Sequence, residues 1–276
     1  MIARAFCPGH ISGLFQVRRH EDVMRTGTRG AGVCVSAGAT STVTLEPGDG
    51  AIEVAIDRVG SSAPVTRDVI ASVVGDSWDV VVETTLDMPM GQGLATSASG
   101  AVSAGLAAAS LLGVDKRVVM EAAHRAEITN GSGMGDVAGI VCGGASVRLR
   151  EGMPPGCRRV ADEGTITVAI VDGPVRTADV LGDVDVMRRL DEAADDCVRD
   201  LGSVVDLGSL LSLSRRFTES SGLAPRGVAE AMSAVPGASM VMLGGSVFCV
   251  GDRRDDLEPY GDTRLVHVDP GPRVTP

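Results

Sequence analysis

The strongest chemical signal lies in residues 89–100, where two glycines one residue apart stand directly before a run of small helix-forming residues. Gly91 and Gly93 allow a tight turn that exposes consecutive backbone N–H groups. Thr96 or Ser97 then begins a helix whose first-turn amides and positive dipole end point outward. Such a start suits phosphate groups, and the Ser97 hydroxyl can reach a magnesium ion. An ordinary turn with a helix cap is the alternative, because the Gly-Lys-Ser/Thr ending of a Walker A loop is missing.

A second group of reactive residues lies on a predicted helix and the loop after it. His124 and Glu127 are three residues apart, so they share one helix face. Asp136 follows a loop with three glycines, which lets its carboxylate approach a substrate hydroxyl. Two carboxylates across a tight loop suit phosphoryl transfer, in which one holds a metal ion and the other orients the nucleophile. A solvated glutamate and a capping aspartate are the alternative.

Two weaker signals lie nearer the ends of the chain. His10 follows Pro8 and Gly9, which we interpret as a turn that ends the first strand. Gly244 and Gly245 stand between two predicted strands, where glycine permits close backbone approach. A structural histidine and a plain β-turn are the alternatives.

In this order the motifs resemble those of the GHMP kinase superfamily, which includes galactokinase, homoserine kinase and mevalonate kinase. The shared features are a Pro-Gly turn near the N-terminus, a Pro-x-Gly-x-Gly-Leu-x-Thr-Ser-Ala loop, an aspartate after a Gly/Ser loop and a C-terminal Gly-Gly. They span residues 1–251. Residues 8–15, 27–32 and 123–137 are similar to the archaeal pantoate kinase branch. That branch phosphorylates the primary hydroxyl of pantoate with ATP on the archaeal route to coenzyme A.

The resemblance implies a role for each matching residue. The loop for the ATP phosphates comprises Pro89, Gly91, Gly93, Leu94, Ala95, Thr96 and Ser97, supported by Gly244 and Gly245. Mg²⁺ is expected on Ser97 and Glu127, and Asp136 is expected to orient or take up the acceptor proton. The positions that match those devoted to pantoate are Thr28, His124 and Arg148. A guanidinium is suited to this role because it grips a planar carboxylate with two hydrogen bonds.

The sequence departs from the superfamily pattern in three places. Many members carry a lysine where His10 stands, paired with the catalytic aspartate. We expect His10 to act with Asp136, either in place of that cation or beside an aspartate that works without one. Ala95 replaces a common glycine, and only Gly244 and Gly245 remain of a longer glycine motif.

The elements that must position these residues can be outlined from local patterns. Candidate strands in the first 87 residues, which read as mostly β, are residues 2–6, 31–36, 41–46, 51–56 and 78–86. Helices are predicted over residues 97–112 and from an Asp115 cap to about residue 129. Further strands are predicted at residues 145–150, 165–171, 239–243, 247–250 and 265–268. Further helices are predicted within residues 177–200, 207–220 and 227–234, with the acidic run 191–200 as a solvated face.

This order predicts an α+β fold class, with helices on one face of an antiparallel sheet in the second half. The resemblance implies a two-lobed GHMP kinase fold. Its β-rich N-terminal lobe, residues 1–153, would hold the ATP loop, the magnesium ligands and the catalytic aspartate, and its ferredoxin-like C-terminal lobe would be residues 154–276. The boundary is placed at the Pro-Pro-Gly run that begins with Pro154.

Composition excludes several functional classes. A net charge of −11 makes nucleic-acid binding unfavourable, and 2% aromatic residues leave few platforms for stacking bases. Six dispersed cysteines argue against a zinc site or a disulfide scaffold and favour a reducing cytoplasm, where they act as small buried hydrophobic residues. Residues 88–114 carry no charge, but their small size favours a buried helix over a membrane span.

Several alternatives stay open at this point. Another kinase of the superfamily, of the homoserine or mevalonate type, would keep the ATP site and change the acceptor. A sensor that has lost turnover, or a binding module without nucleotide, would not be an enzyme, although the presence of Ser97, Glu127 and Asp136 argues against the sensor. The expected partner is small-molecule pantoate, with no nucleic acid and no membrane, and a homodimer is left open.

Overall fold

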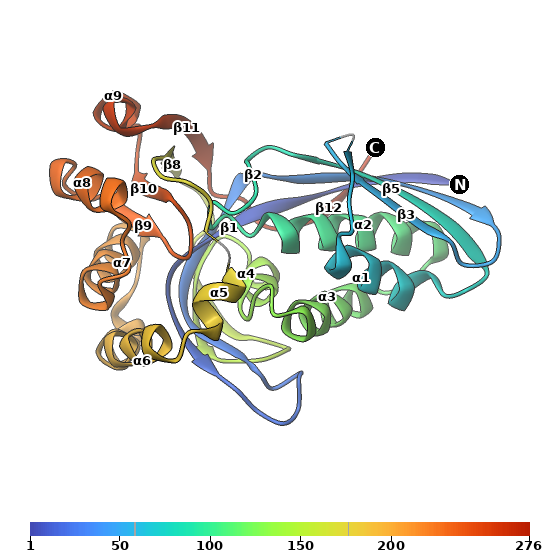
Figure 1. Cartoon of the computed structure of the whole chain (residues 1–276), viewed down its shortest axis with the longest axis horizontal. Coiled ribbons are helices and arrows are strands. Elements are labelled where there is room, and N and C mark those ends of the chain that lie inside the picture. Colours follow the sequence, from blue (N-terminus) through green and yellow to red (C-terminus); the bar gives the residue numbers. More distant parts are fainter. Residues whose placement is uncertain (58, 176) are drawn as a thin grey trace.

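The computed structural model describes residues 1–57, 59–175 and 177–276, which form two packed lobes around two sheets (Figure 1). The larger sheet contains β1 (Ile2–Arg18), β2 (Gly27–Pro47), β3 (Ile52–Ile56), β4 (Val59–Gly60), β5 (Trp78–Leu86), β6 (Ala145–Arg150), β7 (Gly156–Ala161) and β12 (Arg273–Thr275). The smaller sheet contains β8 (Thr165–Ile170), β9 (Ser239–Val241), β10 (Ser246–Val250) and β11 (Asp262–His267).

The helices divide between the two lobes. Those of the first lobe are α1 (Pro64–Val74), α2 (Thr96–Leu112), α3 (Lys116–Asn130) and α4 (Asp136–Cys142). Those that follow are α5 (Thr177–Gly182), α6 (Val184–Arg199), α7 (Leu207–Ser221), α8 (Arg226–Ala234) and α9 (Arg254–Leu257), with short 3₁₀ turns η1 (Leu201–Ser203) and η2 (Glu258–Tyr260).

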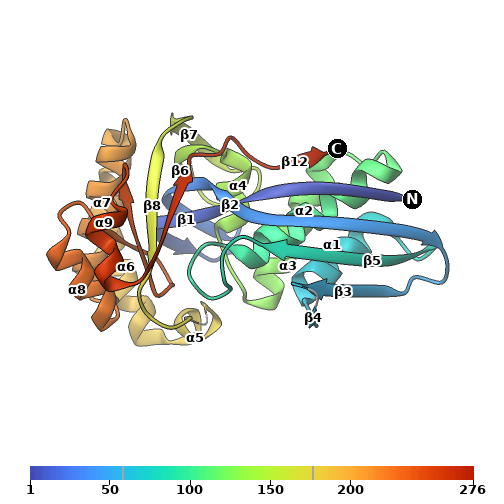
Figure 2. The same cartoon turned by 90° about the horizontal axis from the view of Figure 1, so that it is seen from above.

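The larger sheet has the strand order β12-β1-β2-β5-β3-β4, and β6 and β7 extend it from the other half of β2. Helices α1, α2 and α3 lie together along one face of this sheet (Figures 1 and 2). The predicted small-residue helix is α2, and its residues from Ala98 to Ala109 are buried. A side chain at Gly105 would meet Val69 and Val119, so the small residues of α2 are what allow three helices to pack so closely.

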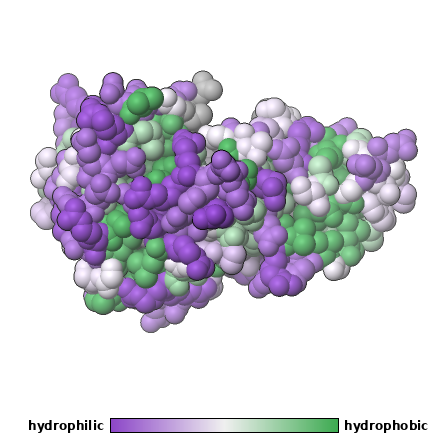
Figure 3. All heavy atoms as spheres, turned by 90° about the horizontal axis from the view of Figure 1, so that it is seen from below, coloured by the Kyte–Doolittle hydropathy of each residue, from purple (hydrophilic) through white to green (hydrophobic). Residues whose placement is uncertain are grey.

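The second lobe is an antiparallel sheet in the order β11-β8-β10-β9, packed against helices α7 and α8. The predicted α+β class and two-lobed arrangement are therefore confirmed. The acidic side chains of the run 191–200 lie on the exposed or half-exposed side of α6 and at its end, and Figure 3 shows hydrophilic side chains over much of this lobe. The last strand, β12, returns to pair with β1 in the larger sheet. The division after residue 153 stays a prediction.

Strands β1 and β2 are much longer than predicted, and the predicted turn at Pro8 and Gly9 is wrong. β1 continues through these residues with a shift in its register against β2, so the Pro-Gly pair forms a bulge. A bulge tolerates proline because it interrupts the hydrogen-bond ladder, to which proline cannot donate. The predicted break between residues 36 and 41 is wrong for the same reason, since β2 runs on through it.

The length of β1 places the middle of the strand between two hydrophobic cores. Ala5 and Cys7 pack in the core formed with helices α1 to α3. Ile11 and Leu14 pack in the core formed with the second lobe. His10 stands between these two groups, so the junction of the two cores is where candidate functional residues gather.

Among the described residues, three helices were missed in the sequence, α1, α4 and the short α9. Helix α1 begins with Pro64 in its first turn and buries Val65, Val69 and Ile70, which is a helical spacing within a region expected to be β. Helix α4 begins at Asp136 after the glycine-rich loop, and its short length left little periodic signal.

The cysteines depart from expectation at one pair. Cys142 at the end of α4 and Cys157 on β7 form a disulfide, so the expectation that the cysteines are small buried hydrophobic residues is wrong for these two. The remaining four, Cys7, Cys34, Cys197 and Cys249, are free and buried, as expected. Among the described residues, no helix combines the length and the apolar character needed to cross a bilayer.

Candidate active site

The predicted phosphate loop turns sharply into the start of α2. The backbone is left-handed at Gly91 (φ 80°), Gly93 (φ 78°) and Ala95 (φ 55°). Ala95 is the N-cap of α2 and offers no side-chain acceptor, so the N–H groups of the first turn are not capped by a side chain. Thr96 and Ser97 stand at this helix start and line a hollow of about 120 Å³ that opens to solvent.

The glycines of the C-terminal Gly-Gly turn support this loop from behind. A side chain on Gly93 would place its Cβ 2.8 Å from the carbonyl oxygen of Met242, and one on Gly244 would collide with the backbone of Gln92. The Ser246 hydroxyl donates a hydrogen bond to Gln92 Oε1 at 3.0 Å. Gly244, Gly245 and Pro89 do not line the hollow, and of these Gly244 lies against the backbone of the loop at Gln92 and Gly93.

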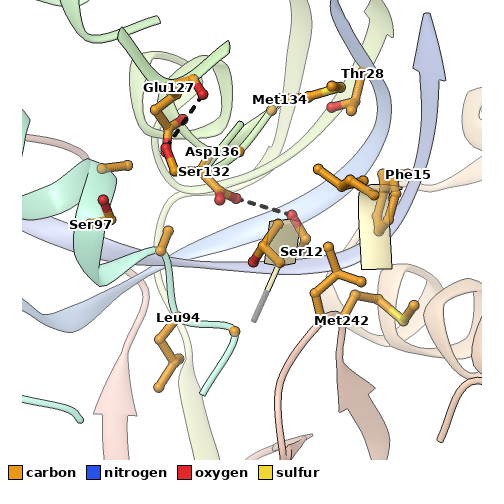
Figure 4. A pocket seen from close by; sticks show the side chains of 18 of the residues that line it. Ser12, Phe15, Thr28, Leu94, Ser97, Glu127, Ser132, Met134, Asp136 and Met242 are labelled. Atoms are coloured by element: carbon orange, nitrogen blue, oxygen red, sulfur yellow. Dashed lines mark hydrogen bonds between the residues drawn. The ribbon is translucent and has the colours of Figure 1, made fainter. Parts of the chain in front are cut away.

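Asp136 lies across the hollow from this loop, as the first residue of α4 (Figure 4). Its side chain is 28% exposed. His10 Nδ1 lies 3.3 Å from Asp136 Oδ1, and the Ser12 hydroxyl donates to the same oxygen at 3.5 Å. Ser12 was missed in the sequence. If β1 had been extended through the Pro-Gly pair, strand alternation would have placed Ser12 on the same face as His10.

The contacts of His10 define its protonation. Arg148 Nη1 lies 3.3 Å from His10 Nε2, and because a guanidinium only donates, Nε2 must accept. The proton of the ring is then on Nδ1, which donates to Asp136. Burial lowers the pKa of His10 and outweighs the hydrogen bond to Asp136, which raises it, while the charge of Arg148 lowers it further, so the neutral ring is favoured. His10 thus meets Asp136 as a neutral donor, with the positive charge one residue behind it on Arg148.

Arg148 is fully buried on β6, opposite Gly30 of β2. Its Nε and Nη2 atoms have no hydrogen-bond partner within the described part of the chain. Thr28 Oγ1 and His124 Nε2 are also buried and also have no hydrogen-bond partner among the described residues. Of the three residues predicted to bind pantoate, Thr28 lines the hollow, whereas His124 and Arg148 are buried and are not among the residues that line it. Burial also lowers the pKa of His124.

Glu127 lies in the last turn of α3 and lines the hollow with only 2% of its surface exposed. Burial, and then the charge of Asp136, raises the pKa of its carboxyl well above the ordinary value. Gly133 passes so close that a Cβ there would lie 2.8 Å from Glu127 Oε1. No ion pair to Glu127 is found among the described residues. A buried carboxylate without a cation fits a divalent ion, which would restore the charged form.

Ser97 is the hydroxyl that could hold a metal ion together with Glu127. Across residues 1–57, 59–175 and 177–276, no group of three or more His, Cys, Asp or Glu side chains is placed to hold a metal ion. Ser97, at the start of α2, lines the same hollow as Glu127 (Figure 4). This pair suits a magnesium ion that takes its other ligands from phosphate oxygens and water, as magnesium commonly does.

Residues 61–144 match the family of GHMP kinases N terminal domain. The pantoate kinase of Methanospirillum hungatei is 30% identical to this chain, over 97% of it and 94% of the relative. The pantoate kinase of Thermococcus kodakarensis is also 30% identical, over 91% of this chain and 88% of the relative. The chain belongs to the pantoate kinase family. The resemblance inferred from the motifs is therefore confirmed, and with it the kinase class.

Solved structures agree with this membership. A protein described as a phosphotransferase related to the CoA biosynthesis pathway superposes with a TM-score of 0.86 and 26% identity, covering 100% of this chain and 99% of that one. Mevalonate-3-kinase from Thermoplasma acidophilum superposes with a TM-score of 0.69 at 15% identity, covering 100% of this chain and 98% of that one, which supports the fold alone. Membership of the pantoate kinase family is therefore supported by sequence and by fold. The individual roles of the residues described above stay predictions.

Proposed function

We propose that this protein transfers the γ-phosphoryl group of ATP to the primary hydroxyl of pantoate, forming 4-phosphopantoate for coenzyme A synthesis. One observation carries the proposal beyond family membership. A single hollow is lined by the uncapped start of α2 on one side and by Glu127 and Asp136 on the other. That is the arrangement that phosphoryl transfer needs, with a phosphate cradle facing a metal ligand and a base.

The nucleotide phosphates would lie on the amides from Gly91 to Ser97. Neutral N–H groups and the dipole of α2 attract phosphate without a lysine, which suits a chain whose single lysine, Lys116, is on α3. Ser97 and Glu127 would hold Mg²⁺ together with phosphate oxygens. When bound, the ion neutralises the charge of the transferring phosphoryl group.

Asp136 would receive the acceptor hydroxyl. In the reaction the hydroxyl oxygen forms a bond to the γ-phosphorus, the bond from that phosphorus to the bridging β–γ oxygen breaks, and the hydroxyl proton passes to Asp136. His10 and Ser12 both donate to Oδ1, which leaves Oδ2 available for the hydroxyl. Since His10 is neutral, it orients the carboxylate without competing for the proton.

Thr28, His124 and Arg148 would hold the rest of pantoate. Nε and Nη2, the two unpaired atoms of Arg148, form the edge of a guanidinium that grips a carboxylate with parallel hydrogen bonds. A buried donor without a partner is costly, so a site that leaves four polar atoms unpaired on Thr28, His124 and Arg148 is suited to a polar ligand. We place this reaction in the cytoplasm, and a homodimer remains a prediction.

The test is steady-state release of ADP with pantoate as the only acceptor, with and without magnesium. We expect turnover that depends on both. Homoserine and mevalonate serve as competing acceptors under the same conditions. Comparable turnover of either one would indicate that the protein is another kinase of the superfamily. Stabilisation by ATP without release of ADP would instead indicate a sensor.

A further inference from the structure

Four apolar side chains line the hollow beside the predicted acceptor residues. Phe15 and Val17 belong to β1, Met134 to the loop before α4, and Met242 to the segment after β9. Their exposed fractions are 5%, 7%, 6% and 2%. Neither phosphate binding nor proton transfer uses an apolar surface, so these residues have no part in the roles assigned above. We call them the apolar wall.

The strand register places this wall next to the acceptor residues. Val17 pairs with Thr28, and Phe15 pairs with Gly30, which in turn pairs with Arg148. Directly opposite residues of antiparallel strands point to the same face of a sheet. Phe15, Val17, Thr28 and Arg148 therefore share one face. Figure 4 shows Phe15, Met134 and Met242 on the same side of the pocket as Thr28, across from Ser97 and Leu94.

Contacts with α7 hold the wall in place from behind. The ring of Phe15 packs edge-on against Phe217, with 6.0 Å between the ring centroids and 64° between the planes. The Thr218 hydroxyl lies 3.7 Å from the sulfur of Met242. The wall is thus part of the core of the second lobe, and its shape is set before any ligand arrives.

We propose that Phe15, Val17, Met134 and Met242 determine specificity by accepting the quaternary carbon of pantoate with its two methyl groups. The inference rests on the proposed function. If the primary hydroxyl of pantoate meets Asp136 and the rest of the molecule lies toward Thr28, the quaternary carbon next to the hydroxyl-bearing carbon lies beside the apolar wall. Linear hydroxy acids offer the same polar ends without the methyl groups. Each methyl group in a fitted apolar pocket is worth roughly 10-fold or more in kcat/KM.

The experiment compares kcat/KM for pantoate with that for dihydroxybutanoate, the analogue without the two methyl groups. We expect the unmodified protein to favour pantoate by about 100-fold or more. Met242→Gln keeps the length of the side chain and makes it polar. It is expected to lower kcat/KM for pantoate by about 10-fold and that for the analogue by less than about 3-fold.

Met232→Gln is the matched control, because Met232 is a buried methionine of α8 that lies outside the hollow. It should leave the preference for pantoate unchanged, and thermal unfolding of all variants reports the cost to the fold. If Met242→Gln fails to fold, Val17→Thr, which keeps the shape and adds a hydroxyl, is measured in the same way.

The outcomes separate the two proposals. If the unmodified protein uses pantoate well but uses the analogue equally well, the apolar wall has no part in specificity and the proposed function stands. If Met242→Gln and Val17→Thr lower kcat/KM equally for both acceptors, the apolar wall has only a structural role. If pantoate is not phosphorylated at all, the proposed function itself fails.

Discussion

The two sides of the hollow are built from different kinds of atoms. The phosphate side consists of main-chain N–H groups and glycines from one short stretch, residues 91–97. The acceptor side consists of side chains from β1, β2, α3, the loop before α4 and α4 itself. The first depends on backbone conformation and the second on strand register and helix placement. Substitutions on the phosphate side should therefore lower the affinity for nucleotide. Substitutions on the acceptor side should lower the turnover of the acceptor.

The largest expected effect is on the acceptor side. Asp136→Asn keeps the size of the side chain and removes the carboxylate, so kcat should fall by roughly 10²–10⁴-fold. Affinity for ATP should change little, because the amides of α2 are untouched. The measurements are ADP release with pantoate and thermal stabilisation by ATP. Asp49→Asn, in an exposed turn, is the control. Near-normal turnover of Asp136→Asn would remove Asp136 from the reaction.

The disulfide links the helix that carries Asp136 to β7, because Cys142 is the last residue of α4 and Asp136 is the first. Removing the disulfide therefore tests how strongly this part of the acceptor side is stabilised. Cys142 and Cys157 are 15 residues apart, and closing a loop of that length is worth about 3 kcal/mol in the chain-entropy model. A reducing agent should lower the urea midpoint of the unmodified protein, and the double variant Cys142→Ala with Cys157→Ala should be insensitive to it.

Cys197→Ala, which removes a free buried thiol, should keep the response to the reducing agent. No change in the midpoint of the unmodified protein on reduction would mean that the two cysteines are unpaired in solution.

A smaller effect is expected on the phosphate side. Gly93→Ala adds a Cβ at a left-handed residue and 2.8 Å from the Met242 carbonyl oxygen. The backbone cost alone is about 1–2 kcal/mol, so KM for ATP should rise by about 10-fold while KM for pantoate changes less. Gly113→Ala is a close control, since Gly113 is also left-handed (φ 68°) but has open space around it. Equal effects of both variants on ATP would mean that the shape of the loop does not matter.

The smallest effect concerns stability as a function of pH. The folded pKa of Glu127 lies well above its ordinary value of 4.5, so the folded protein retains a proton that the unfolded chain releases. The contribution of Glu127 to wild-type stability must therefore fall as pH rises from that value toward the raised pKa. Glu127→Gln removes this dependence, so the stability of the variant relative to wild type should increase with pH across that window.

Urea unfolding at several pH values measures this difference without ligands. Glu121→Gln, on the exposed side of α3, should run parallel to wild type. If the difference in stability between Glu127→Gln and wild type is also independent of pH, the carboxyl of Glu127 is solvated in the folded protein.

Local patterns predicted much of the fold. Helix α2 differs from its predicted range by one residue, β5 matches residues 78–86, and Asp115 caps α3 through the amide of Arg117 as expected. Each of these depends on neighbours in sequence. The error at Pro8 and Gly9 has the opposite origin. Alone the pair favours a turn, but pairing with β2 over the whole strand outweighs that preference and leaves a bulge.

The site divides in the same way. The sequence alone identified the family and predicted the phosphate loop and the roles of Glu127 and Asp136, because glycine spacing and helix starts are properties of adjacent residues. Only the tertiary structure decided that His10 is neutral, that Arg148 stands behind it and that Ser12 and the apolar wall face Asp136 and Thr28. Those relations depend on the register of β1, β2 and β6 and on burial, which no contiguous stretch of residues contains.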